Sequence, residues 1–193
     1  MNVGIYIYDE AEVLDFSGPF EVFSTASRVA EASEPFSVFL IAEEQRIVRA
    51  RGGYLVQPHY SIDDHPTVDL LIVVGGVHLE EMKNQRALAW IAQQAKQAGL
   101  VASVCTGAFL LAEAGVLTAQ RVTTHWEDIP DLRTDYPDLS VVEDQRWVDD
   151  GEIVTSGGIS AGIDMSLYLV SRLESLTLAE KTARQMEYDW VRR

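Results

Sequence analysis

The sequence predicts an α/β fold in which a mostly parallel, doubly wound sheet carries helices on both faces. Short apolar stretches rich in β-branched residues alternate along the chain with longer helical stretches. The run at residues 68–74, Val-Asp-Leu-Leu-Ile-Val-Val, is almost continuously apolar, as is typical of a central parallel strand. No composition break, repeat or low-complexity segment divides the 193 residues, so we expect one domain over residues 1–193.

The first half begins with an expected strand at residues 2–8, where β-branched and aromatic residues dominate. Ser17 or Gly18 can cap the helix that follows, with Pro19 in its first turn, and this helix is expected to end near Ala32. Apolar composition and the Gly-Gly turn then predict a strand at 36–42, a hairpin of 46–50 and 54–57, a polar linker at 61–66 and the strand at 68–74.

The second half continues the alternation of helices and strands. A helix at 88–98, with Gly99 as its C-cap, precedes a buried strand and a helix at 107–114. The remaining expected elements are a short strand end at 122–126, a short helix at 126–135, a hairpin of 140–148 and 152–156, a long apolar helix after the glycine-rich residues 157–162, and a last helix that Thr177 caps and that ends near Tyr188.

Cys105, the only cysteine, lies where the buried strand turns abruptly into a helix. A nucleophile elbow requires small neighbours, and they are present: Ala102, Ser103, Thr106, Gly107 and Ala108. The N-terminus of the next helix would face the sulfur and lower the pKa of the thiol, which favours the nucleophilic thiolate. A lone cysteine is more often an inert buried residue, but this context favours a nucleophile.

Four loops lie at the carboxyl edge of the sheet. One of them holds Cys105, and the other three carry further candidates. Asp15, between Leu14 and Phe16, suits proton transfer if it is desolvated, although the local sequence alone favours a surface residue that caps a helix.

The other two loops hold Gly75-Gly76 and His125. The N–H groups of Gly76 and Thr106 are suited to an oxyanion hole, whereas the rival interpretation of the glycine pair is a plain tight turn. His125 is either a base for the cysteine or a core histidine beside Trp126. We expect Val77, His78 and Trp126 to shape the pocket.

Composition limits the partners and the compartment. A net charge of −15 argues against binding to nucleic acid or to a membrane surface, although solubility alone explains it. No run reaches the ~18 apolar residues of a membrane span, and no signal peptide is evident. A single cysteine excludes an internal disulfide and suits a cytoplasmic protein.

The sequence predicts neither a metal nor a cofactor. The four histidines, His59, His65, His78 and His125, are scattered without the spacing of a metal site. No phosphate loop or dinucleotide fingerprint is present. We therefore expect a small-molecule substrate that is processed by side chains and backbone alone.

Five segments, in this order, resemble the ThiJ/PfpI superfamily, which has a flavodoxin-like, class I glutamine amidotransferase-like fold. They are residues 14–19 (Leu-Asp-Phe-Ser-Gly-Pro), 75–76, 103–107 (Ser-Val-Cys-Thr-Gly), 123–126 (Thr-Thr-His-Trp) and 157–164 (Gly-Gly-Ile-Ser-Ala-Gly-Ile-Asp). Within the superfamily the chain is most similar to isonitrile hydratases and to the sensor domains of AraC-type transcription regulators.

The resemblance implies a role for each matching residue. Cys105 would be the elbow nucleophile and Asp15 the carboxyl group that handles protons. Thr106 would supply an amide and a hydroxyl beside the thiolate, and Gly76 a second amide. In the hydratase reaction the thiolate attacks an isonitrile carbon, and water then yields an N-substituted formamide. The resemblance also implies a homodimer and a cysteine that is prone to oxidation to sulfinic acid.

Two departures from the family pattern narrow the expected activity. Thr106 replaces the histidine that follows the cysteine in the protease-like branch, which argues against peptidase and deglycase activity. Val74 stands where the family often has proline, so the loop beside the oxyanion site is expected to differ.

The alternative to an enzyme is a ligand or oxidation sensor without turnover. The AraC-type regulators carry a DNA-binding helix pair after this domain, whereas this chain ends at Arg193 and is acidic. We therefore expect a cytoplasmic, homodimeric hydratase or hydrolase with Cys105 as its nucleophile.

Overall fold

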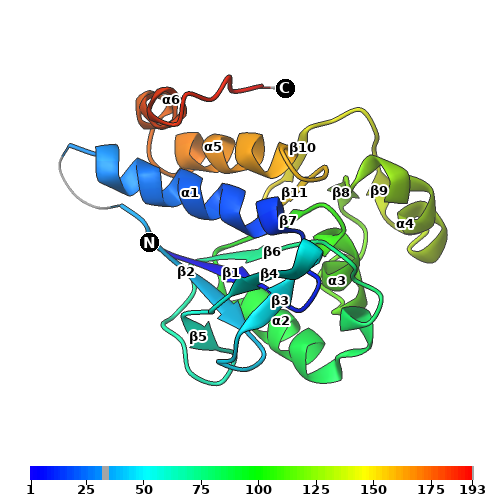
Figure 1. The fold of residues 1–193 in the computed structure, drawn as a ribbon. Helices are drawn as coiled ribbons and strands as arrows, with labels where there is room; N and C mark the ends of the chain where they lie inside the picture. Colours follow the sequence, from blue (N-terminus) through cyan, green and yellow to red (C-terminus); the bar gives the residue numbers. More distant parts are fainter. Residues whose placement is uncertain (32–34, 193) are drawn as a thin grey trace.

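A seven-stranded sheet forms the centre of the computed structural model, which describes residues 1–31 and 35–192 (Figure 1). The strand order is β10-β11-β7-β6-β1-β2-β5, and only β10 runs antiparallel to its neighbour. The strands are β1 (Asn2–Tyr6), β2 (Ser37–Ala42), β5 (Tyr60–Ser61), β6 (Leu70–Val73), β7 (Leu100–Val104), β10 (Trp147–Asp150) and β11 (Ile153–Ser156). The predicted α/β class and mostly parallel sheet are confirmed.

Helices cover both faces of this sheet (Figure 1). On one side, α1 (Val13–Val29), α5 (Ala161–Leu173) and α6 (Leu176–Gln185) pack against one another. On the other side lie α2 (Gln85–Gln97) and α3 (Gly107–Glu113). Among the described residues, no helix combines the length and apolar character needed to cross a membrane.

Smaller elements surround this core. Two-stranded sheets are formed by β3 (Val48–Ala50) with β4 (Tyr54–Val56), and by β8 (Arg121–Val122) with β9 (Ser140–Val141). The short helices are η1 (Arg51–Gly53), η2 (Glu81–Lys83), η3 (Trp126–Asp128) and α4 (Ile129–Asp135).

Strand β6 is central, as its apolar sequence predicts. It lies between β1 and β7, and all four of its residues are buried. Every residue of β7 is buried as well, because helices cover both faces of the sheet there. Strand β7, which leads directly into Cys105, is therefore enclosed in the middle of the molecule.

The first helix begins earlier than predicted. It starts at Val13, so Pro19 lies inside α1 instead of in its first turn, and Asp15 belongs to that first turn. An internal proline costs a helix about 3 kcal/mol, and burial of Phe16, Val22 and Phe23 offsets this cost. The helix ends at Val29, and the predicted end at Ala32 lies outside the described residues.

The boundaries of two helices were also placed wrongly from the sequence. Helix α2 starts at Gln85, where the Asn84 side chain accepts a hydrogen bond from an N–H at 3.2 Å, and its C-cap is Ala98 instead of Gly99. Ser175, not Thr177, caps α6 by accepting from an N–H at 3.1 Å, and this helix ends at Gln185. In both cases the capping residue lies before the point where the apolar pattern starts.

The region after α3 differs most from the prediction. Strand β8 ends at Val122 and pairs with β9 outside the central sheet, so His125 does not follow a strand of that sheet. The predicted strand 140–148 is divided into β9 and β10, and only β10 forms the hairpin with β11. Short segments that pair with distant partners leave too little periodicity to be read from sequence.

Candidate active site

Cys105 occupies a strained elbow between β7 and α3. Its backbone has φ of 57°, a left-handed conformation that is uncommon for a residue with a side chain. Two hydrogen bonds hold the turn: the Cys105 N–H donates to the Gly157 carbonyl at 3.2 Å, and the Thr124 hydroxyl donates to the Cys105 carbonyl at 2.8 Å. The predicted nucleophile elbow is confirmed as a backbone geometry.

Glycines make this elbow possible. A Cβ on Gly75 would lie 2.5 Å from the Thr106 nitrogen and 2.8 Å from the Cys105 Cβ. A Cβ on Gly107 would lie 2.1 Å from the Val73 carbonyl oxygen. The elbow therefore packs directly against the end of β6, where a larger side chain does not fit.

Asp15 lies fully buried beside the elbow, so it is not the surface residue that its local sequence alone favours. Its Oδ2 accepts from the Gly75 N–H at 3.1 Å, and its Oδ1 accepts from the Ile159 N–H at 3.2 Å. Burial raises the pKa of Asp15 to about 7, and the charge of Glu12 adds to this, although both hydrogen bonds oppose the shift. The carboxyl group can therefore hold or release a proton near neutral pH.

The pKa of the Cys105 thiol is raised, not lowered as the sequence predicts. Burial has the largest effect, the nearby charge of Asp15 adds to it, and the Thr106 N–H acts in the opposite direction. Only 7% of Cys105 is exposed, and the seven-residue helix α3 does not compensate for the lost hydration. At neutral pH, Cys105 and Asp15 form a pair in which a proton is retained.

The Thr106 hydroxyl connects the elbow to the glycine loop. It accepts from the Gly76 N–H at 3.0 Å and donates to the Gly76 carbonyl at 3.2 Å. Gly76 has φ of 143°, and a Cβ there would lie 2.3 Å from the Glu10 carbonyl oxygen, so the loop is more constrained than a plain turn. The Gly76 N–H is engaged by Thr106 in this arrangement, and an oxyanion role for it remains a prediction.

A cavity of about 270 Å³ opens at Cys105 and Thr106. The loop after β6 forms one wall through residues 76–79, so the predicted contribution of Val77 and His78 is confirmed. The other lining residues come from separate elements: Glu12, Arg51, His125, Glu127, Asp128 and Ile159. This volume suits a small substrate.

His125 lines the cavity and is not a core histidine. Its Nδ1 lies 3.2 Å from Asp128 Oδ2, and a Cβ on Gly158 would approach its ring to 2.1 Å. In contrast to the prediction, Trp126 does not line this cavity. It is 75% exposed and borders a neighbouring depression, because the chain turns into η3 at this point.

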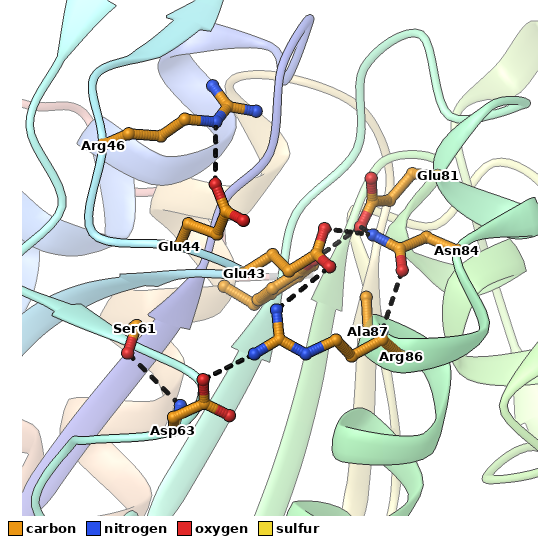
Figure 2. Close-up of polar contacts among 10 residues, drawn as sticks. Glu43, Glu44, Arg46, Ser61, Asp63, Glu81, Asn84, Arg86 and Ala87 are labelled. Atoms are coloured by element: carbon orange, nitrogen blue, oxygen red, sulfur yellow. Dashed lines mark hydrogen bonds and ion pairs between the residues drawn. The ribbon is translucent and has the colours of Figure 1, made fainter.

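Polar contacts fix the segment that follows the cavity wall (Figure 2). Glu43, just after β2, accepts from the Asn84 side chain at 2.7 Å and from Arg86 at 3.2 Å. Arg86 also pairs with Asp63 at 2.5 Å, while Glu81 accepts from Asn84 at 3.3 Å. These contacts join the start of α2 to the carboxyl end of β2, directly after the segment that forms the cavity wall.

Comparison with known proteins identifies the family. The model of the DJ-1/PfpI family matches residues 1–172. The chain belongs to the DJ-1/PfpI family. The earlier resemblance to the ThiJ/PfpI superfamily is thereby confirmed.

Relatives of this DJ-1/PfpI chain include both enzymes and regulators. Isonitrile hydratase of Pseudomonas putida is 33% identical over 190 residues, which cover 97% of this chain and 78% of that protein. The HTH-type transcriptional regulator GbdR of Pseudomonas aeruginosa is 25% identical over 191 residues, and the chain spans about half of that regulator, 52%. A ThiJ/PfpI family structure from Pseudomonas syringae superposes with a TM-score of 0.86 at 25% identity, covering 97% of this chain and 75% of the other.

Sequence reasoning missed several residues that the DJ-1/PfpI fold brings to this site. Ile159 has φ of 55°, which is strained for a β-branched residue, and this directs its N–H to Asp15. Arg51 reaches the cavity from the β3–β4 hairpin and pairs with Glu12 at 3.1 Å. Neither contact has a local signal, because both join segments that are far apart in the sequence.

Proposed function

We propose that this chain is a cysteine-dependent enzyme that hydrates a small electrophile, converting an isonitrile to an N-substituted formamide. The observation that carries the proposal is the strained elbow, which holds the only cysteine beside a buried carboxyl at a small cavity. The 33% identity to isonitrile hydratase over 97% of the chain supports it.

The proposed reaction uses Cys105 and Asp15 as a proton-sharing pair. The sulfur bonds to the isonitrile carbon, the thiol proton passes to Asp15, and Asp15 returns a proton to the same carbon. The product is a thioimidate on Cys105. Water then bonds to that carbon, one of its protons reaches the nitrogen, and the carbon–sulfur bond breaks to give the formamide and the thiol. Atoms balance with one isonitrile and one water molecule.

Neighbouring residues have supporting roles in this proposal. The Thr106 N–H and, once its bond to Thr106 is released, the Gly76 N–H would stabilise negative charge next to the sulfur. Asp128 orients His125 at the cavity wall, where the ring can bind the attacking water.

Turnover of a small alkyl isonitrile tests the proposal. The purified protein is incubated with the isonitrile, and N-alkylformamide is measured by mass spectrometry. We expect formation in the wild type and loss of at least about a thousandfold in Cys105→Ser. His65→Gln, which lies outside the cavity, serves as the matched control and should retain turnover. Formamide formation at equal rates in Cys105→Ser would rule the proposal out.

A ligand or oxidation sensor is the second candidate function. Similarity to GbdR over 99% of the chain favours it. A sensor would bind the isonitrile or react with peroxide at Cys105 but release no formamide. Measurement of formamide therefore separates the two functions, and titration of the thiol with peroxide, followed by intact-mass measurement, tests the oxidation response of a sensor.

We propose further that the protein is a cytoplasmic homodimer that does not bind nucleic acid, as its net charge of −15 suggests. Sedimentation equilibrium should give twice the 21.5 kDa chain mass. A mobility shift of random duplex DNA in 0.1 M salt would contradict the expected lack of nucleic-acid binding.

A further inference from the structure

Two buried side-chain oxygens in residues 1–31 and 35–192 have no hydrogen-bond partner, the Tyr8 hydroxyl and the Ser103 Oγ. Ser103 lies on β7, two residues before Cys105. Tyr8 follows β1 by two residues and is 4% exposed. An unsatisfied buried hydroxyl destabilises a fold, so its presence requires a physical explanation.

The backbone places Tyr8 beside the glycine loop of the site. Strand β1 pairs with β6 in a register that sets Tyr6 opposite Val73, the last residues of the two strands. The Tyr8 carbonyl accepts from the Ala11 N–H at 3.1 Å, and Ala11 in turn bridges to Gly76. The loop that begins at Tyr8 is therefore attached to the glycine loop, and Gly75 of that loop packs against the elbow.

The Tyr8 side chain is fixed within this region. Its ring stacks on that of Tyr6, with centroids 6.3 Å apart. Burial and the charges of Asp15, Glu81 and Cys105 raise the pKa of Tyr8 well above its ordinary value. The hydroxyl therefore stays protonated, and its O–H can rotate to suit its surroundings.

We propose that the Tyr8 hydroxyl is a positioning group for the Cys105–Asp15 pair: its free O–H dipole turns toward negative charge as that charge forms on the pair. The proposal rests on the proposed role of Cys105 as a nucleophile. It explains why the hydroxyl is left without a permanent partner, because a permanent acceptor would hold the dipole in one direction.

The charged side chains around the Cys105–Asp15 pair determine in which direction the loss of the Tyr8 hydroxyl shifts its ionisation. Arg51, which pairs with Glu12, is a cation at the same cavity. The carboxylates that act on the three groups are negative: Glu12 acts on Asp15, Asp128 acts on Cys105, and Glu81 acts on Tyr8. Each of these disfavours ionisation of the group on which it acts, whereas the Tyr8 dipole favours ionisation of the pair. Removal of the hydroxyl should therefore move ionisation of the pair to higher pH.

Alkylation of the only cysteine by iodoacetamide measures this effect directly. The Cys105 sulfur forms a thioether while iodide leaves, and the rate follows the thiolate fraction. We expect Tyr8→Phe to slow alkylation about threefold to tenfold at pH 8 and to move the pH profile upward by about half a unit to one unit, the size of one hydrogen bond. Its urea midpoint should equal or exceed that of the wild type, because an unsatisfied buried group is removed.

Tyr6→Phe is the matched control. The Tyr6 hydroxyl donates to Glu81 at 2.5 Å, and the ring of Tyr6 stacks on that of Tyr8. Loss of that bond should lower the urea midpoint and leave the alkylation profile of Cys105 unchanged. The two variants thus predict opposite patterns of stability and reactivity.

Three results would overturn the inference: an alkylation profile in Tyr8→Phe identical to the wild type, equal shifts in both variants, or a lower urea midpoint in Tyr8→Phe than in Tyr6→Phe. Alkylation needs no substrate. A wild type that fails to hydrate isonitriles would therefore contradict the proposed function, while the alkylation profiles would still decide the role of Tyr8.

Discussion

At the scale of single residues, two groups of raised pKa define the chemistry of this site. Burial raises the pKa of both Asp15 and Cys105; Asp15 raises the pKa of the thiol further, whereas the thiol acts on Asp15 in the opposite direction. The composition around Cys105 was sufficient to predict an elbow, since only small residues allow the turn. The burial of Asp15 could not be read from the sequence, because its partners, the N–H groups of Gly75 and Ile159, lie 60 and 144 residues away.

The ionisation of Asp15 should appear in the pH dependence of stability. Its pKa is about 7 in the folded protein against an ordinary 3.8, so the folded state binds more protons between these values. The stability that the protonated carboxyl provides is therefore complete below pH about 4 and is lost as the pH rises through about 7.

We expect the free energy of unfolding of the wild type, relative to Asp15→Asn, to fall by up to roughly 4 kcal/mol between pH 4 and pH 8. Urea denaturation of both proteins at a series of pH values measures this difference. A difference that does not change with pH would show that Asp15 ionises at its ordinary pKa.

At the scale of elements, the contact between the end of β6 and the elbow holds the site together. We predict that Gly75→Ala destabilises the protein by about 1–3 kcal/mol and reduces alkylation of Cys105, because the new Cβ would lie 2.5 Å from the Thr106 nitrogen. Gly99→Ala is the control, since its nearest neighbour would be 3.9 Å away. Equal stability of the two variants, measured by thermal denaturation, would contradict this packing.

The start of α6 provides a second test at this scale. Ser175→Ala should cost about 1 kcal/mol of stability, because the cap of the helix is lost. Thr177→Ala, at the exposed position that the sequence favoured as the cap, should change stability by less than about 0.5 kcal/mol. The reverse order in urea denaturation would restore the predicted cap.

The elements that could be predicted are those with strong local patterns. Strand β6 is a continuous apolar run, and the β3–β4 hairpin turns at Gly52-Gly53 as expected. The start of α1 was missed because Gly18 and Pro19 suggest a helix start, while in the fold Gly18 permits close packing of α1 against Ile163 of α5. Tertiary contacts of this kind override local propensity and leave no trace in the local sequence.

At the scale of the whole molecule, acidity is the dominant property. The net charge of −15 lies on a chain of 193 residues, so like charges repel across the folded surface. We expect the melting temperature to rise by several degrees when sodium chloride is increased from about 10 mM to 300 mM, since salt screens this repulsion. Differential scanning fluorimetry measures the shift, and a melting temperature that falls with salt would show that attractive ion pairs dominate instead.

The covalent role of Cys105 is the central claim, and intact-mass spectrometry during turnover tests it most directly. The protein is mixed with an alkyl isonitrile and quenched in acid at short times. We predict that the wild type gains the mass of one isonitrile molecule on Cys105, that this adduct disappears as formamide accumulates, and that Cys105→Ala shows neither. Formamide production by Cys105→Ala, or by the wild type with no adduct at any time, would contradict the account.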